Sequence, residues 1–305
     1  MNMGKERKVN WEEMFPDEFL KTIKKCPVCY CAYGLAEPHG TYNALGLDWL
    51  KAEALLERAA RKYGGIVAPP CAWHMQENPS FPWLESKGVK QSLCSSIPPD
   101  LFYRLVIYQI RAIDARGFQV GILITGHYGG LENDLRLLCE YYLRRTGSPL
   151  RLYASADWEL IRFEDYSGDH AGICETSQLM ALRPNLVDLE RKEETSISGP
   201  WAGVSFPYSD GRMPSRELGE KIVHSQIKKL GEIQRELLDK YKPLKVWKAP
   251  SLNDTEDIWH RFERLTRKYW RTSRTLEEYL KALEEYRKDK KLPSPKFPGW
   301  EALGE

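Results

Sequence analysis

Histidine is scarce in this chain of 305 residues, and three of its six histidines stand beside carboxylates or glycines. In Glu37-Pro38-His39 the proline favours extended backbone at the residue before it, and side chains at i and i+2 of an extended chain point to the same side. Glu37 and His39 can therefore face one point. Asp48 begins the next helical pattern and can join them in a mixed nitrogen and oxygen set, which suits zinc and related cations. Seen alone, Asp48 is better explained as the N-cap of that helix.

Two later segments place histidines at predicted element boundaries. His127 follows the most apolar run of the sequence, in the turn 126–130 (GHYGG). Glycines let a ligand approach closely, and the N-terminus of the following helix favours an anion; the alternative is a purely structural turn. Near the start of another predicted helix, Asp169 can orient His170 or cap the helix, and Glu175 can share a face with His170. The alternative is that Asp169 only caps and Glu175 pairs with a surface base.

The elements that must position these residues alternate between apolar runs and amphipathic patterns. Strands are predicted at 26–33, 65–70, 118–125 and 150–154, and helices at 48–64, 98–116, 131–145 and 169–182. This alternation predicts an α/β fold with a mainly parallel sheet covered by helices on both faces, and functional groups at the carboxyl ends of the strands. Long charged helices are predicted further on, at 215–242, 255–268 and 275–290.

In order and spacing, these segments resemble the creatininase family of metal-dependent amidohydrolases. The motifs are Glu37-x-His39-Gly40 with Asp48, Gly126-His127-x-Gly129, and His170-Ala171-Gly172-x-x-Glu175-Thr176-Ser177. The resemblance runs from about residue 26 to 223 and implies a three-layer αβα sandwich and, commonly, a hexamer. We expect a hydrolase domain over residues 1–242 and a helical C-terminal extension over 243–305, packed on or between the subunits of a homo-oligomer.

For the site, the resemblance implies a binuclear centre that holds two divalent metal ions, with zinc, manganese or iron as occupants. Glu37 would bind one ion, His39 and His127 would bind the other, and Asp48 would bridge both. Members of the family usually have Glu-Gln-His-Gly where this chain has Glu-Pro-His-Gly, a change that stiffens the loop and removes no ligand.

The chemistry implied by the resemblance is hydrolysis of the C–N amide bond of a small or cyclic substrate by a metal-bridged hydroxide. His170 would protonate the leaving nitrogen, Asp169 would tune its orientation, and Glu175 completes the catalytic group. Tyr128 and Tyr166 are candidates for covering the substrate, although buried tyrosines are commoner as core residues or hydrogen-bond anchors.

Other positions leave alternatives open. Gly129 stands where creatininases have a glutamate that completes the shell of the first metal, and Glu132, Glu175 or water could replace that ligand. His74 lies in a long aromatic loop, 71–96, where it could contact substrate or be solvated. The missing carboxylate motivates a rival interpretation, a non-catalytic relative that keeps the fold as a binding or assembly module.

Composition excludes several classes of protein. Basic and acidic side chains number 45 and 43, and the net charge of +2 argues against a nucleic-acid-binding role. No apolar run approaches the roughly 20 residues of a membrane span, and no signal peptide is visible, so we expect a cytoplasmic protein without a membrane partner. Cys26-x-x-Cys29-x-Cys31 lacks the second pair that a zinc knuckle needs, and its cysteines are expected as small buried hydrophobes.

Overall fold

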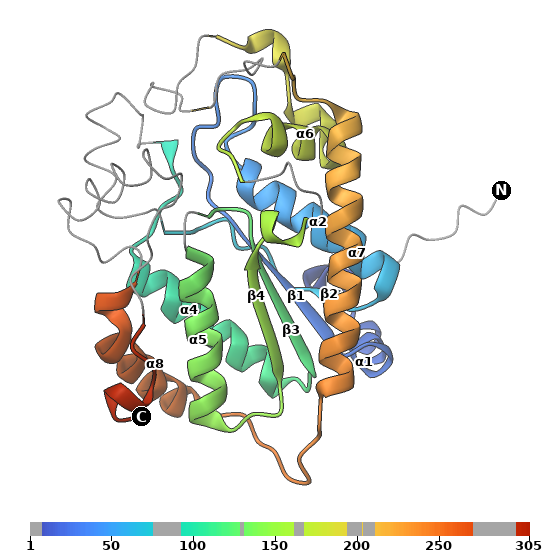
Figure 1. Ribbon diagram of the computed structural model, residues 1–305. Helices are drawn as coiled ribbons and strands as arrows, with labels where there is room; N and C mark the ends of the chain where they lie inside the picture. Colours follow the sequence, from blue (N-terminus) through green and yellow to red (C-terminus); the bar gives the residue numbers. More distant parts are fainter. Residues whose placement is uncertain are drawn as a thin grey trace.

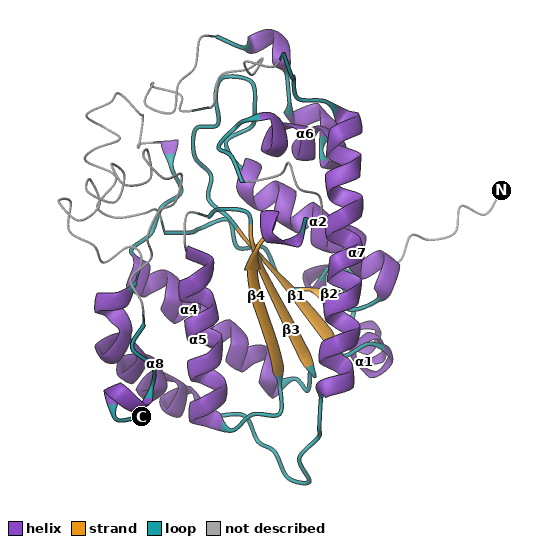
Figure 2. Ribbon diagram, viewed as in Figure 1, coloured by secondary structure: helices purple, strands orange, loops and turns teal. Residues whose placement is uncertain are grey.

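The computed structural model describes residues 8–75, 93–128, 131–161, 168–193, 203, 211–270 and 297–305. Its sheet has four parallel strands in the order β2-β1-β3-β4 (Figure 2). They are β1 (Val28–Tyr33), β2 (Ile66–Val67), β3 (Val120–Thr125) and β4 (Arg151–Ala156). Each strand lies at or within a residue or two of its predicted apolar run, and β2 is much shorter than its run. The predicted α/β class with a parallel sheet is confirmed.

The strand register aligns the carboxyl ends of the three longer strands. Tyr33 at the end of β1 pairs with Thr125 at the end of β3, and Thr125 pairs with Ala156 at the end of β4. The connections that leave these strands therefore start from one edge of the sheet, where parallel α/β folds place their sites.

Helices cover both faces of the sheet, which gives three layers (Figure 1). One face carries α4, α5 and α8, and the other carries α2, α6 and α7. The helices are α1 (Pro16–Lys25), α2 (Leu47–Tyr63), α4 (Pro99–Ala115), α5 (Leu131–Thr146), α6 (Ile173–Leu182), α7 (Arg216–Lys240) and α8 (Leu252–Thr266). Short 3-10 turns lie at Trp11–Glu13, Trp158–Leu160, Pro184–Leu186, Leu189–Arg191, Arg267–Tyr269 and Glu301–Leu303.

The side chains of β1 divide between the two layers of helices. Successive side chains of a strand point to opposite faces. Cys29, Cys31 and Tyr33 accordingly join the core beneath α4, α5 and α8, whereas Val28 and Tyr30 join the core beneath α2 and α7. Cys29 and Cys31 are buried free thiols, as expected of small core residues.

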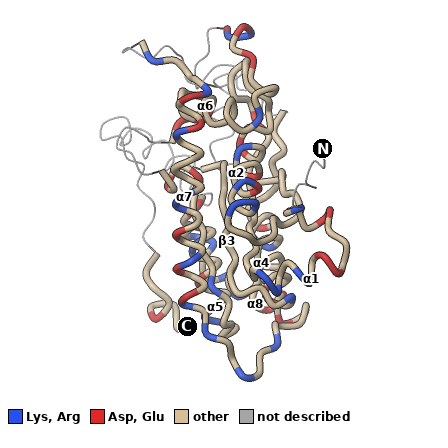
Figure 3. The backbone as a smooth tube through the Cα atoms, turned by 90° about the vertical axis from the view of Figure 1, so that its right-hand side faces the viewer, with Lys and Arg blue, Asp and Glu red and all other residues tan. Residues whose placement is uncertain are grey.

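The C-terminal extension contributes to the core of the same chain. Trp259 and Phe262 of α8 are buried in the cluster that covers the α4 and α5 side of the sheet. The predicted helix at 275–290 lies outside the described residues, and the domain boundary at residue 242 stays a prediction. Basic and acidic side chains intersperse along α7 (Figure 3), and no helix in the described part of the chain is long and apolar enough to cross a membrane.

Candidate metal centre

Two glycines let α2 begin directly against the ends of β1 and β3. A Cβ atom added to Gly34 would lie 2.3 Å from the backbone nitrogen of Trp49, and one added to Gly126 would lie 2.0 Å from the carbonyl oxygen of Asp48. Only glycine permits so close an approach of backbone to backbone. The first turn of α2 is thereby held against both strand ends, beside the connections that carry the predicted histidines.

Asp48 sits inside α2 rather than at its cap. The N-cap is Gly46, and Asp48 is buried in the first turn. Its Oδ1 lies 3.1 Å from Nε2 of His39, and its Oδ2 lies 3.1 Å from Nδ1 of His127. Burial raises the pKa of Asp48, but the two imidazoles outweigh burial and hold this pKa well below its usual range. The N-cap interpretation of Asp48 is therefore wrong, and this carboxylate converges with two histidines.

Glu37 and His39 complete the same cluster from the connection after β1. Nδ1 of His39 lies 2.9 Å from the carbonyl oxygen of Glu37, so it donates a hydrogen bond there and leaves Nε2 facing Asp48. Oε1 of Glu37 lies 3.1 Å from Nδ1 of His127. Burial lowers the pKa of both histidines, but the carboxylates raise it more, to about 9 for His39 and about 10 for His127. The cluster is a strong binder of positive charge.

This buried set fits a divalent metal ion. Three groups of side chains bring their ligand atoms within 4.8 Å of one another, and they are Glu37/Asp48/His127, His39/Asp48/Glu175 and Glu37/His39/His170. Nε2 of His39 faces two carboxylate oxygens, Oδ1 of Asp48 at 3.1 Å and Oε2 of Glu175 at 3.8 Å, and such an arrangement is stabilised by a proton or a metal ion. Asp48 belongs to two of the groups, as a bridging ligand must. His127 groups with Glu37, whereas the family resemblance placed it with His39.

We call the five residues Glu37, His39, Asp48, His127 and His170 the polar cluster. His170 is its more exposed member. Its Nε2 lies 3.0 Å from the carbonyl oxygen of Pro38, its ring centroid is 4.4 Å from that of His39, and its side chain is 25% exposed. Burial and the neighbouring His39 lower the pKa of His170. The ring is therefore a neutral imidazole that contacts the cluster on one side and is partly exposed on the other.

The turn that carries His170 precedes α6 instead of belonging to it. The helix begins at Ile173, and Asp169 accepts the backbone N–H groups of Cys174 at 2.8 Å and Glu175 at 3.0 Å. Ala171 has φ of +55°, and it is the one non-glycine residue with positive φ in the described ranges. Such strain is typical of functional sites. Asp169 thus binds two first-turn N–H groups of α6, whose N-cap is Gly172, and ties the strained turn to the helix, so it positions His170 through the backbone.

Glu175 and Tyr128 are engaged with a buried cation that the sequence analysis missed. Nζ of Lys51 is fully buried and lies 2.5 Å from Oε1 of Glu175 and 3.5 Å from Oδ2 of Asp157. The hydroxyl of Tyr128 lies 2.7 Å from the same Glu175 oxygen and 2.8 Å from the carbonyl oxygen of Asp169. Tyr128 is thus a hydrogen-bond anchor, and the predicted pairing of Glu175 with a surface base is wrong.

Lys51 and Asp157 were not singled out from the sequence, although each carries a signal there. Lys51 lies one turn after Asp48 in the apolar stripe of α2, where a lysine is unusual unless it is paired. Asp157 directly follows the last residue of β4, in a strand-end connection like the one after β3 that holds His127. Burial lowers the pKa of Lys51, but Asp157 and Glu175 outweigh burial and keep it above its usual value. Lys51 is therefore charged.

The remaining candidates lie in different surroundings. His74 is fully buried, with its ring centroid 4.0 Å from that of Phe102 and 5.2 Å from that of His127, so the interpretation as a solvated loop residue is wrong. Burial lowers the pKa of His74 to about 3. Glu132 is buried in α5 and belongs to none of the three metal-binding groups among the described residues. Tyr166 lies outside the described residues.

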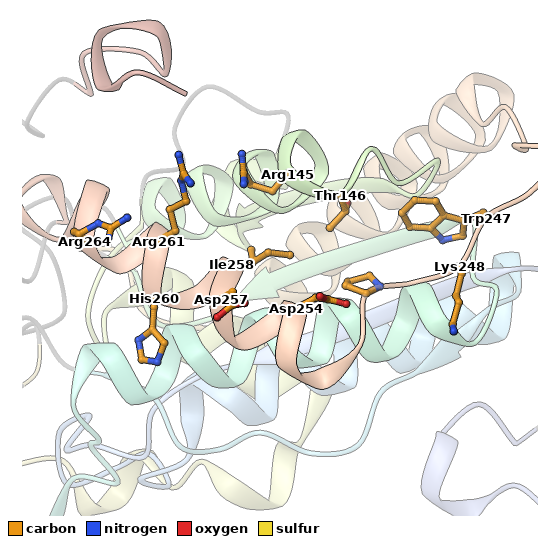
Figure 4. Close-up of a pocket in the computed structure, with 11 residues that line it drawn as sticks. Arg145, Thr146, Trp247, Lys248, Asp254, Asp257, Ile258, His260, Arg261 and Arg264 are labelled. Carbon is orange, nitrogen blue, oxygen red and sulfur yellow. The ribbon is translucent and has the colours of Figure 1, made fainter.

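A cavity of about 530 Å³ lies elsewhere, between α5, α8 and the segment that joins α7 to α8 (Figure 4). Its lining includes Arg145, Trp247, Lys248 and Arg264. These elements meet near the amino ends of the strands, so the cavity is separate from the polar cluster (Figure 1).

Residues 12–233 match the profile of the Creatininase family, described as creatinine amidohydrolase. This chain belongs to the creatininase family. A curated creatinine amidohydrolase from Pseudomonas putida is 24% identical over 233 residues, which cover 67% of this chain and 86% of that relative. The resemblance drawn from the three motifs is confirmed.

Solved creatininases share the fold of this family member. A structure described as creatininase Mn has a TM-score of 0.58 at 22% identity, and a mutant creatininase of Zn-Zn type has a TM-score of 0.57 at 22% identity. Each match covers 78% of this chain and 100% of the solved chain. A mutant creatininase complexed with creatine has a TM-score of 0.55 at 23% identity, over 75% of this chain and 98% of that chain.

Proposed function

We propose that this creatininase-family chain is a metal-dependent amidohydrolase that cleaves the C–N amide bond of a small or cyclic substrate. The observation that carries the proposal is the buried convergence of Glu37, His39, Asp48 and His127, in which two carboxylates and two imidazoles supply donor atoms that a metal ion can bind in place of the protons on the imidazoles. The relative from Pseudomonas putida is a creatinine amidohydrolase, and a fold relative was solved with creatine. Creatinine is therefore the first substrate to test.

The residues suggest how the site would hold its ion or ions. Glu37, Asp48 and His127 form one set of donors, and His39 shares Asp48 with a second set. Zinc, manganese and iron all accept such a mixture of imidazole and carboxylate. Divalent ions of this kind, when bound, make water a nucleophile near neutral pH and stabilise negative charge on a carbonyl oxygen.

His170 is the group best placed to move a proton. Its Nε2–H donates to the carbonyl oxygen of Pro38, so its Nδ1 carries the lone pair, 3.9 Å from Oε1 of Glu37. In the proposed reaction Nδ1 takes a proton from water and then gives it to the leaving nitrogen. Asp169 contributes by holding the turn that aims this ring.

The test combines metal content with hydrolysis. The purified chain is stripped with a chelator, reloaded with zinc or manganese, and assayed on creatinine and on a panel of small cyclic and linear amides. We expect hydrolysis that requires the metal and is lost in His127→Ala. His260→Ala, on the exposed side of α8, is the matched control and should keep both metal and activity. A reloaded chain that binds well under one ion, or that hydrolyses amides equally well without metal, would refute the proposal.

The predicted assembly is tested separately. A homo-oligomer such as a hexamer in the cytoplasm remains the expectation from the family resemblance. Light scattering of the purified chain should give a multiple of 35.4 kDa, and a mass equal to one chain would contradict the expected assembly.

A further inference from the structure

Lys51 places a fixed positive charge beside the candidate metal centre. Its side chain is fully buried, and its Nζ lies 2.5 Å from Oε1 of Glu175, 3.5 Å from Oδ2 of Asp157 and 4.7 Å from the ring centroid of Tyr128. A buried ammonium is costly unless carboxylates surround it, and here two do. The charge is therefore a built part of the site, held from α2 one turn beyond Asp48.

This cation already uses the carboxylate that a second metal ion would need. Oε1 of Glu175 faces the Lys51 ammonium and the Tyr128 hydroxyl, and Oε2 accepts the backbone N–H of Ala171 at 2.8 Å. Both oxygens of Glu175 are thus hydrogen-bonded, one of them to a charged donor. Such charge-assisted bonds are short and strong, so the carboxylate would have to give them up to bind a metal.

The two candidate sets of ligands that contain Asp48 differ accordingly. The third set takes its one carboxylate, Glu37, from the set around His127, so it offers a second ion no carboxylate of its own. In the set around His127, Nδ1 lies 3.1 Å from a carboxylate oxygen of Glu37 and 3.1 Å from one of Asp48. In the set around His39, Nε2 lies 3.1 Å from Asp48 but 3.8 Å from Glu175. The set around His39 is looser, and a divalent ion there would also meet the repulsion of the Lys51 ammonium.

We propose that Lys51 supplies the second positive charge of this centre, so that the chain holds a single tightly bound metal ion on Glu37, Asp48 and His127. This inference rests on the proposed function, because it assumes that the polar cluster binds metal. Glu175 then serves as the counterion of Lys51 and, through Ala171, as a support of the His170 turn. His39 remains a neighbour of the ion through Asp48 and is not a ligand of a second one.

The decisive measurement is the number of ions per chain. The full-length protein is equilibrated with zinc and, in a parallel experiment, with manganese. The number of bound ions per chain is measured by elemental mass spectrometry and by isothermal titration calorimetry. We expect one tight ion in the wild type. In Lys51→Met, which removes the charge and keeps the length of the side chain, we expect a second ion. Lys51→Arg keeps the charge and should stay at one ion, as should Lys62→Met on the exposed side of α2.

A second variant keeps the inference falsifiable if Lys51→Met does not fold. Glu175→Gln should leave the single ion bound, with an affinity within about threefold of the wild type, because Glu175 neither binds this ion nor supports one of its ligands. Loss of a group that supports a metal ligand typically weakens metal binding by about 10- to 100-fold. Two tight ions in the wild type, with one lost in Glu175→Gln, would overturn this inference and leave the proposed function intact. No tight ion in the wild type would overturn both.

Discussion

The polar cluster at the carboxyl ends of the strands and the aromatic cluster beneath α8 are both buried, yet burial has opposite consequences in them. The rings of the aromatic cluster (Tyr141, Trp259, Phe262, Trp270 and Trp300) pack against one another, with centroids 5.4 Å apart for the tilted pair Tyr141 and Phe262 and 5.9 Å apart for the stacked pair Phe262 and Trp270. Its burial is favourable by itself. The polar cluster hides carboxylates and imidazoles from water, and that burial is favourable only with compensating positive charge.

The difference separates residues that stabilise the fold from residues that need a ligand. Removing an aromatic ring should cost stability and leave the metal centre unchanged. Removing a carboxylate of the polar cluster should abolish metal binding and leave the fold in place, because such a change also removes a buried negative charge. Substitutions in the two clusters test this separation, beginning with the largest effect.

Asp48→Asn should have the largest effect on function. Asp48 belongs to two of the three metal-binding groups and contacts both His39 and His127, so the neutral amide weakens both sets of ligands. We expect bound metal to fall to near zero and hydrolysis to fall by at least about a thousandfold, which corresponds to the several kcal/mol that a metal contributes to the transition state. Metal analysis and steady-state kinetics measure the two losses.

Circular dichroism supplies the control for Asp48→Asn. A folded spectrum with lost metal supports the separation between site and fold. Retention of a full complement of metal by folded Asp48→Asn would show that the polar cluster is not the metal centre.

Phe262→Ala should have the largest effect on stability. Phe262 is fully buried between Tyr141 and Trp270, and its removal leaves a cavity on the α4 and α5 side of the sheet. We expect the free energy of unfolding to fall by about 3–5 kcal/mol, as large-to-small substitutions of buried aromatics do. Denaturant unfolding measures the change, and the metal content per folded chain should not change. A loss below about 1 kcal/mol would mean that α8 is not part of this core.

The overall fold could be predicted because it rests on local patterns. The apolar runs that became β1 and β3 are continuous, as strands buried on both faces must be. The helical patterns between the strands predict the crossover connections that parallel pairing requires. That topology also brings the ends of β1 and β3 together, which is why the positions of His39 and His127 in the sequence predict that their side chains converge; each lies 3.1 Å from a carboxylate oxygen of Asp48.

The parts that could not be predicted depend on contacts between distant segments. The pair of Lys51 and Glu175 joins positions 124 residues apart, and no local pattern specifies it. His74 comes from a segment without periodicity, and its burial against Phe102 depends on the packing of α4. Asp48 illustrates the reverse error: the local rule for a helix N-cap was sound, but the close approach at Gly34 and Gly126 moved the helix start and turned the carboxylate inward.

Removal of metal should destabilise the wild type by an intermediate amount. A ligand present at 100 times its dissociation constant stabilises the native state by about 2.7 kcal/mol, so chelation should lower the unfolding free energy by about that much. Thermal unfolding with and without chelator measures the shift. Asp48→Asn should show no shift, whereas Phe262→Ala should show the same shift as the wild type. An equal response of Asp48→Asn and the wild type would break the assignment of the metal to the polar cluster.

The smallest effect is expected at Glu53, a buried carboxyl of α2 outside both clusters. Burial and the neighbouring Glu57 raise the pKa of Glu53 from 4.5 to about 7. The native state therefore binds more protons than the unfolded state between about pH 4.5 and 7, and stability falls as pH rises through that window. Glu53→Gln removes this titration, so it should gain about 1 kcal/mol over the wild type at pH 8 and little at pH 5, after allowance for solvent screening. Denaturant midpoints at the two pH values measure the difference.

Glu57→Gln is the contrasting variant, because it weakens the 2.9 Å hydrogen bond from Asn10 and should lose stability at both pH values. A pH-independent effect of Glu53→Gln would show that Glu53 stays ionised in the native state, and would make Arg183, 3.7 Å away, its dominant partner.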